Sequence, residues 1–331
     1  MIALAVAALV GAAVLFYLRS IGLMGEREPG AETTVVVPEG AGAARIGRLL
    51  EDKGVVPSAL GFRIAAFLDG STEDIEAGNY VLARNLNARP ALAALLDGPE
   101  TEPFVNVTFP EGSWLTDFAR IVGEDTRISG DRFLRLARSG RVASRLRPAR
   151  VDTLEGLLFP STYQVIRRDT ARSLLSRLVS ELEKQLAAID VGGVKEMGYT
   201  PYELVIVASM VEAEAKVPED RARIAAVIYN RLAAGMMLGI DATVSYALGE
   251  HRESLTREDL DVNSPYNTRR YPGLPPTPIG APGRASLEAA AGPAPGDWLY
   301  YVVADCNGRH AFSESYEQFL ADKAAYQALR C

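Results

Sequence analysis

The stretch Thr200–Asp220, TPYELVIVASMVEAEAKVPED, decides how the C-terminal part of this chain folds. Thr200 can cap a helix, Pro201 fits its first turn, and Glu203 completes a capping box. The residues from Leu204 to Val211 follow almost without a polar side chain. Such a helix is apolar on all sides, so we expect it to run through a core.

Two acids, Glu212 and Glu214, close this apolar helix. Partial burial disfavours the charged form of a carboxyl, which suits a general acid at neutral pH. Residues two apart on a helix point about 200° away from each other, so only one of the two acids can face a given cleft. The alternative is that both acids are simply solvated, and the burial of the helix alone does not exclude it.

The composition narrows the class of protein. The chain has 331 residues, enough for two or three domains, with 48% hydrophobic and 23% charged residues. Its formal net charge of -7 argues against nucleic acid as a partner. His251, His310, Cys306 and Cys331 form no close cluster, so we predict no metal site and no cofactor. A disulfide between the two cysteines and unpaired cysteines are both compatible with their spacing.

Ile2–Leu18, IALAVAALVGAAVLFYL, is an uncharged run that would extend about 26 Å as a helix, close to the thickness of a bilayer core. We therefore predict a membrane anchor at residues 1–19, followed by a tether at 20–33. A cleaved signal peptide is the alternative, but no Lys or Arg precedes the run and no small-x-small cleavage site follows it. Arg19 lies after the run and by itself favours a cytoplasmic C-terminal side.

A pattern of strand, Pro-Glu-Gly turn and amphipathic helix occurs twice after the tether. Val35–Gly40, VVVPEG, leads into one helix and Val107–Gly112, VTFPEG, leads into the other, 72 residues later. Both copies continue through a second short strand into another helix. We infer two related α/β modules and give Glu39 and Glu111 a structural role as turn or cap residues.

Loops dominate the chain beyond Gly235. Pro272–Gly283, PGLPPTPIGAPG, holds five prolines and three glycines in twelve residues, so it is stiff and suits a fixed wall beside a groove. A surface linker is the alternative. Trp298–Ala304 predicts a strand, with its partner at His310–Ser313. The loops carry polar and aromatic side chains that suit a polyhydroxylated substrate: Asp241, Thr243, Tyr246, Tyr266, Asn267, Thr268 and His310.

An acid at a buried helix end beside such loops is suited to sugar chemistry. One carboxyl can protonate a glycosidic oxygen and then accept a proton as the carboxylate. The sequence contains no phosphate-binding loop and no Gly-x-Ser-x-Gly elbow. Residue types alone leave sugar cleavage as one hypothesis among several.

Several motifs, in order along residues 35–325, resemble the MltG/YceG family of endolytic murein transglycosylases. They are EGLLFPSTY (Glu155–Tyr163), ASMVEAEA (Ala208–Ala215), IYNRL (Ile228–Leu232), DATVSYALG (Asp241–Gly249), PYNTRRYPGLPPTPIGAPG (Pro265–Gly283) and VVADCNGRHAF (Val302–Phe312). The resemblance implies an α+β fold with an N-terminal transmembrane helix and a small LysM-like α/β module at 34–104. A larger α+β catalytic domain follows at 105–331, and it includes a second repeat-like module at 105–190.

The resemblance also implies a reaction, the cleavage of the MurNAc–GlcNAc bond within nascent peptidoglycan strands with formation of 1,6-anhydroMurNAc ends, which limits strand length. Glu212 matches the catalytic glutamate, implied to protonate the glycosidic oxygen and then to take the proton of the MurNAc C6 hydroxyl. No water is consumed, so no second carboxylate is needed to activate one. The implied substrate-binding residues are Glu214, Asp241, Thr243, Tyr246, Tyr266, Asn267, Thr268 and His310.

Location and partners follow from the same resemblance. The catalytic domain is expected on the periplasmic or extracytoplasmic side of the inner (cytoplasmic) membrane, held by a single span, with peptidoglycan synthases as further partners. The charge of Arg19 conflicts with this orientation. A hydrolase and a non-catalytic, membrane-anchored peptidoglycan-binding protein are the alternatives. The chain departs from the family pattern at Gly239, Ile240 and Ala242, and at Cys306, where a glycine is usual.

Overall fold

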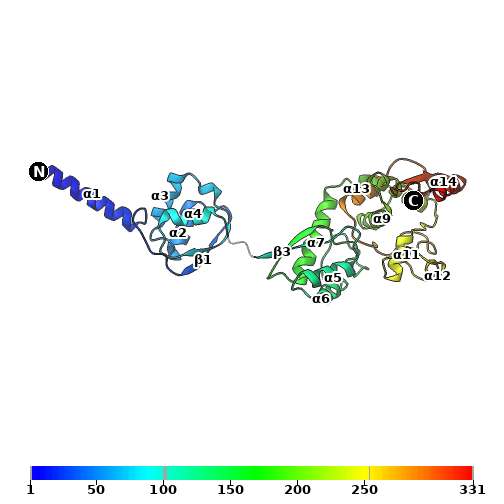
Figure 1. The fold of residues 1–331 in the computed structure, drawn as a ribbon, viewed down its shortest axis with the longest axis horizontal. Coiled ribbons are helices and arrows are strands. Elements are labelled where there is room, and N and C mark those ends of the chain that lie inside the picture. Colours follow the sequence, from blue (N-terminus) through cyan, green and yellow to red (C-terminus); the bar gives the residue numbers. More distant parts are fainter. Residues whose placement is uncertain (1, 100–102, 253, 330–331) are drawn as a thin grey trace. The chain divides into compact units, whose positions relative to one another are not determined.

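The computed structural model describes residues 2–99, 103–252 and 254–329. The chain divides into two compact units, Met1–Pro103 and Phe104–Cys331, and each is described by itself. Helices and strands are mixed in both units, so the predicted α+β class is confirmed (Figure 1).

The first helix of the N-terminal unit, α1, covers Ile2–Ser20. Its described side chains, from Leu4 onward, are almost all exposed. Across the part of the chain that the structure describes, no helix is both long and apolar enough to cross a membrane. The predicted anchor at 1–19 is therefore not confirmed.

The remainder of the N-terminal unit packs an antiparallel strand pair and its helices around one small core. Val35 and Val37 of one strand and Tyr80 and Leu82 of the other point into this core, while the residues between them face outward. The assignment of this module as LysM-like stays a prediction. The elements are β1 (Glu32–Val37), α2 (Ala43–Asp52), α3 (Ala59–Asp69), η1 (Thr72–Asp74), β2 (Gly78–Ala83) and α4 (Ala88–Leu96).

The C-terminal unit begins with the same order of elements. Its β3 and β4 form an antiparallel pair, as β1 and β2 do, and each pair is followed by one further helix. The helices α2 and α5 begin at Ala43 and Leu115, which reproduces the 72-residue shift of the sequence. The repeated pattern is thus present in the topology as strand, helix, helix, strand and helix.

The C-terminal unit continues with further helices and one more strand pair. The elements of the unit are β3 (Phe104–Thr108), α5 (Leu115–Asp125), α6 (Gly130–Ala137), β4 (Thr162–Ile166), α7 (Ala171–Ala187), α8 (Gly192–Glu196), α9 (Pro201–Glu214), η2 (Pro218–Asp220), α10 (Arg221–Ala233), α11 (Asp241–Leu248), α12 (Arg257–Leu260), α13 (Arg284–Ala291), β5 (Tyr300–Val303), β6 (His310–Ser313) and α14 (Tyr316–Ala328).

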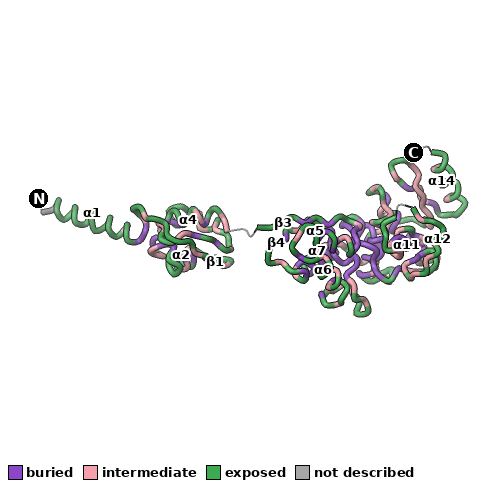
Figure 2. The backbone as a smooth tube through the Cα atoms, turned by 60° about the horizontal axis from the view of Figure 1, so that its bottom comes forward, coloured by how far each residue is buried: buried purple, intermediate pink, exposed green. Residues whose placement is uncertain are grey.

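Helix α9 runs through the core of this unit, as its apolar sequence predicts. Thr200 Oγ1 accepts a hydrogen bond from Glu203 N, and the Glu203 carboxylate accepts one from Thr200 N at 2.8 Å, so the predicted capping box is confirmed. Every residue from Leu204 to Val211 is buried, and the helix packs against α10 and α13. In Figure 2 the buried residues gather in the interior of this unit, between α7 and α11.

The strands near the C-terminus also agree with the prediction. β5 pairs with β6 in an antiparallel register that runs from Tyr300↔Ser313 to Val303↔His310, and α14 packs against both. Cys306, in the turn between these strands, is disulfide-bonded. The partner considered for it, Cys331, lies outside the described residues.

Replacing Thr200 by Ala should lower the free energy of unfolding by about 1 kcal/mol, because it removes the oxygen that caps α9. Thr200→Ser keeps that oxygen and should stay close to wild type. Urea titration followed by tryptophan fluorescence reports on the C-terminal unit, which contains α9, since Trp114 and Trp298 both lie in that unit. Equal losses in the two variants would contradict the capping role.

Candidate active site

Glu212 lies in the last turn of α9, at a point where distant parts of the chain meet. Its Oε2 accepts a hydrogen bond from Gly283 N at 3.0 Å, and its Oε1 lies 3.8 Å from Nη2 of Arg221. The side chain is only 9% exposed. The carboxylate is therefore held in one orientation, against a guanidinium, at the end of a buried helix.

The proline-rich loop is a fixed part of this site and not a surface linker. Ile279 N donates to Ser209 Oγ of α9 at 3.1 Å, and Gly112 N of the Pro-Glu-Gly turn donates to Ala281 O at 2.8 Å. Gly280 has no room for a side chain, because a Cβ there would lie 2.7 Å from Gly112 O. The loop thus locks together α9 and the Pro-Glu-Gly turn.

Sequence reasoning missed Glu111, which the structure places beside Glu212. The Glu111 carboxyl lies so close to Gly283 that a Cβ on that glycine would overlap it. Burial and the nearby charge of Glu212 raise the pKa of Glu111, while Arg221 lowers it. No local signal separates this glutamate from Glu39, because both stand in the same Pro-Glu-Gly turn.

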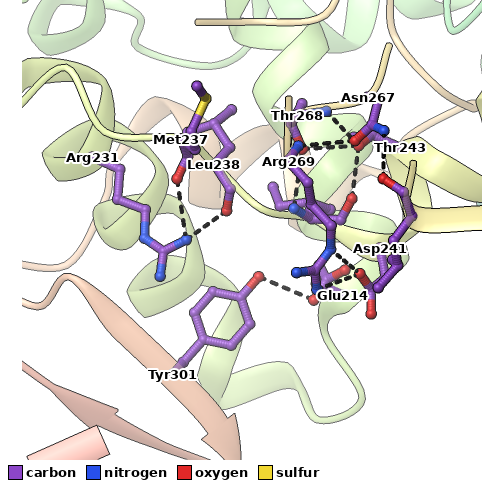
Figure 3. A network of polar contacts seen from close by, with 12 residues as sticks. Glu214, Arg231, Met237, Leu238, Asp241, Thr243, Asn267, Thr268, Arg269 and Tyr301 are labelled. Atoms are coloured by element: carbon purple, nitrogen blue, oxygen red, sulfur yellow. Dashed lines mark hydrogen bonds and ion pairs between the residues drawn. The ribbon is translucent and has the colours of Figure 1, made fainter. Parts of the chain in front are cut away.

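Glu214 faces a different set of groups from Glu212 (Figure 3). Tyr301 Oη donates to Glu214 Oε2 at 3.0 Å. Burial raises the pKa of Glu214, and the hydrogen bond from Tyr301 opposes this shift. The two acids of the helix are thus separated as the helical spacing predicts, one at Gly283 and the other at Tyr301.

Hydrogen bonds between buried threonines hold the loop that follows α10. Thr243 Oγ1 and Thr268 Oγ1 lie 2.9 Å apart, and Thr268 Oγ1 also accepts from Ile240 N at 3.0 Å. Both threonines are buried, so in this conformation they hold the loop in place behind the site. Asp241, by contrast, is 57% exposed and pairs with Arg269 at 2.6 Å.

Tyr246 and Tyr266 lie in an aromatic cluster with Trp114. The Tyr246 ring is 5.1 Å from Trp114, edge to face, and 4.9 Å from Tyr266. Tyr246 Oη donates to Glu155 Oε2 at 3.0 Å, and Tyr266 Oη lies 2.9 Å from Thr277 Oγ1 of the proline-rich loop. Both tyrosines are half-buried, so solvent reaches part of each side chain.

Asn267 and His310 are buried and bonded within the protein. Asn267 Nδ2 donates to the carbonyl oxygens of Leu260 and Val262, each at 2.9 Å. His310 N donates to Asp220 Oδ2 at 2.7 Å, and His310 Nδ1 lies 2.9 Å from the same oxygen. This pair ties β6 to the turn that precedes α10.

Two groups of residues emerge from these contacts. Glu212, Glu111 and Arg221 meet at the proline-rich loop, while the remaining sequence-predicted residues support the loops or line the aromatic cluster. Among the residues that the structure describes, no set of His, Cys, Asp and Glu side chains could hold a metal ion. A bound oxygen next to Glu212 could receive its proton, and the carboxylate could then take another.

A model of the YceG-like family matches residues 35–325. The chain belongs to the YceG-like family. A YceG-like protein of known crystal structure from Listeria monocytogenes is 31% identical and aligns with a TM-score of 0.59, over 88% of this chain and 99% of that one. The resemblance noted in the sequence is therefore confirmed.

Curated relatives of this YceG-like chain carry the name endolytic murein transglycosylase. The one from Bacillus subtilis is 28% identical over 314 residues, which are 91% of this chain and 86% of that protein. The one from Streptococcus pneumoniae is 29% identical over 312 residues, which are 86% of this chain and 56% of that protein. The chain thus spans little more than half of the pneumococcal relative.

Glu155 is a buried acid whose ionisation should make stability depend on pH. It is 3% exposed and accepts hydrogen bonds from Leu115 N at 3.1 Å and from Tyr246 Oη. Burial raises its pKa from 4.5 to about 7, even though these hydrogen bonds oppose the shift. The stability that protonated Glu155 contributes is therefore present below pH 4.5 and lost as the pH rises through about 7.

Replacing Glu155 by Gln should remove this pH dependence, while the one amide oxygen can still accept from both Leu115 N and Tyr246 Oη, as Glu155 Oε2 does. Between pH 4.5 and about pH 7, the free energy of unfolding of wild type should fall by roughly 3 kcal/mol more than that of the variant. Urea titrations at about pH 5 and about pH 8, read by tryptophan fluorescence, measure the difference. Parallel pH profiles for the two proteins would sink this account of Glu155.

Proposed function

We propose that this chain is an endolytic murein transglycosylase, a lyase that cleaves the MurNAc–GlcNAc bond within peptidoglycan strands and leaves 1,6-anhydroMurNAc ends. The observation that carries the proposal is Glu212, held at the end of a buried helix by the Gly283 N–H and set against Arg221. Relatives with this name at 28% and 29% identity support it.

In the proposed reaction Glu212 exchanges one proton twice. Its carboxylic acid protonates the oxygen between MurNAc and GlcNAc as the bond from that oxygen to C1 breaks. The C6 hydroxyl oxygen of the MurNAc then attacks C1, and its proton passes to the Glu212 carboxylate. Gly283 N–H fixes Oε2, and Arg221 stabilises the carboxylate between the two transfers. The reaction consumes no water.

The other residues support this reaction in different ways. Tyr246 and Tyr266 are partly exposed and offer aromatic rings to sugar, and exposed Asp241 can accept hydrogen bonds from hydroxyls. Hydrogen bonds within the protein give the other predicted residues a role in positioning the loops, and they are Glu214 and the buried Thr243, Asn267, Thr268 and His310. Curated relatives named endolytic murein transglycosylase favour catalysis over binding alone.

The substrate also fixes the proposed location and partners. Nascent peptidoglycan lies outside the cytoplasmic membrane, so we place the C-terminal unit on the extracytoplasmic side. Enzymes that polymerise glycan strands supply the substrate, which makes peptidoglycan synthases the natural partners. A LysM-like role for the N-terminal unit and a membrane anchor at its start belong to the same proposal.

Replacing Glu212 by Gln keeps the size of the side chain and removes the group that exchanges protons. Release of anhydro-muropeptides from purified glycan strands should fall by roughly 10²–10⁴-fold, the usual contribution of a general acid and base. Liquid chromatography with mass spectrometry measures the products. It also separates lysis from hydrolysis, because hydrolysis adds water and gives reducing ends.

Glu124→Gln is the matched control for this experiment. Glu124 is an exposed acid of α5 whose ion pair, among the described residues, is with the exposed Arg120, so its replacement should leave product release unchanged. Undiminished release of anhydro products by Glu212→Gln would refute the assignment of Glu212.

A further inference from the structure

We propose that Glu111 is a second carboxylate of the active site, which stabilises the positive charge that develops at C1 of the MurNAc ring. This inference rests on the proposed function of Glu212 and deepens it. The family resemblance assigns chemistry to one carboxylate only, and the turn that holds Glu111 has a sufficient structural explanation in its sequence. The case for Glu111 therefore comes from its position.

Glu111 and Glu212 meet at the same glycine. The Gly283 N–H donates to the Glu212 carboxylate at 3.0 Å, and the Glu111 carboxyl occupies the space where a Gly283 side chain would stand. The turn itself also touches Glu212, since a Cβ on Gly112 would lie 3.9 Å from Glu212 Cγ. The carboxyls of Glu111 and Glu212 thus both lie against the backbone of Gly283.

The first module contains the same turn without this arrangement, and so provides a comparison within one chain. Gly40 and Gly112 have φ of 66° and 76°, so both turns have their glycine in the left-handed region. Nothing lies within 4 Å of where a Gly40 Cβ would stand. Among the described residues Glu39 has no hydrogen bond or ion pair. The turn conformation therefore does not require a glutamate placed against another carboxylate.

Placing two carboxylates together is unfavourable for the fold, since each disfavours the charge of the other. Burial raises the pKa of Glu111 most, the charge of Glu212 adds to this rise, and Arg221 offsets part of it. Such arrangements are characteristic of functional sites. Glu111 is also an exposed residue, unlike Glu212, so solvent reaches it.

The charges balance throughout the proposed step. Before reaction Glu212 is protonated, and the Glu111 carboxylate and the Arg221 guanidinium cancel. When the proton moves to the leaving oxygen and the C1–O bond breaks, Glu212 becomes negative and the sugar ring becomes positive. The attack of the C6 oxygen neutralises the ring and returns a proton to Glu212. Glu111 forms no bond, and its charge lowers the energy of the oxocarbenium-like state.

The test compares Glu111→Gln with Glu39→Gln in the full-length chain, using release of anhydro-muropeptides from glycan strands. Glu111→Gln should lower kcat by roughly 100-fold with little change in KM, because the lost interaction is made in the transition state. Glu39→Gln should match wild type. Since Glu111 must be ionised, wild-type kcat should also fall as the pH drops through its raised pKa, and this acid limb should be missing in Glu111→Gln.

Gly283→Ala provides a second route that leaves the Glu111 charge in place. Gly283 has φ of -74° and ψ of 170°, which alanine adopts readily, so the new Cβ should displace the flexible Glu111 carboxyl without unfolding α13. The kcat of Gly283→Ala should fall. The variant that combines Glu111→Gln with Gly283→Ala should lose less transition-state stabilisation than the two single variants lose together. Tryptophan fluorescence confirms that each variant is folded.

The outcomes separate the two proposals. If Glu111→Gln has the same kcat as wild type and the same fall in kcat at low pH, the role of Glu111 is overturned and that of Glu212 stands. Equal losses in Glu39→Gln and Glu111→Gln would overturn it as well, because the effect would then belong to the turn. If wild type itself releases no anhydro product, the proposed function fails, and the role of Glu111 fails with it.

Discussion

The hydrogen bond from the Gly283 N–H to the Glu212 carboxylate joins the buried helix to the loop that forms its wall, and the geometry of the site depends on it. A hydrogen bond to a charged group contributes about 1.5–3 kcal/mol, so it can fix the carboxylate only if the donor itself is fixed. Ser209 holds the loop from the side of α9, and Gly112 holds it from the side of the turn. Prolines restrict the backbone between these contacts.

Helical spacing then makes the two acids of α9 face different groups. With one residue between them, Glu212 and Glu214 cannot both face the proline-rich loop. The Glu212 carboxylate meets the Gly283 N–H and the Arg221 guanidinium, while Glu214 accepts a hydrogen bond from the Tyr301 hydroxyl. An N–H and a guanidinium can hold a carboxylate between two proton transfers, and Glu214 has a neutral hydroxyl as its partner instead. This difference favours Glu212 as the reactive acid.

Local sequence signals predicted α9, its capping box, the repeated turn and the late strand pair, because each depends on residues close together in the chain. Contacts between distant segments were out of reach. Glu111 looks like Glu39 in sequence, and Arg221 looks like an ordinary residue at a helix start. Thr243 and Thr268 suggested a polar groove, yet they bond to each other in the interior. Polar residue types in a loop do not reveal whether the side chains face solvent or the loop behind them.

The two Pro-Glu-Gly turns show how one local structure can take on different roles. Both need glycine at a positive φ, and both connect a strand to an amphipathic helix. In the C-terminal unit another loop closes on the turn, through the contact between Gly112 N and Ala281 O. That closure brings Gly283 and Glu212 to Glu111, whereas Glu39 is exposed and no described residue lies near the Cβ position of the adjacent Gly40. The chemistry of the second glutamate therefore arises from the loop that covers it, and a motif search confined to the turn would treat the two as equals.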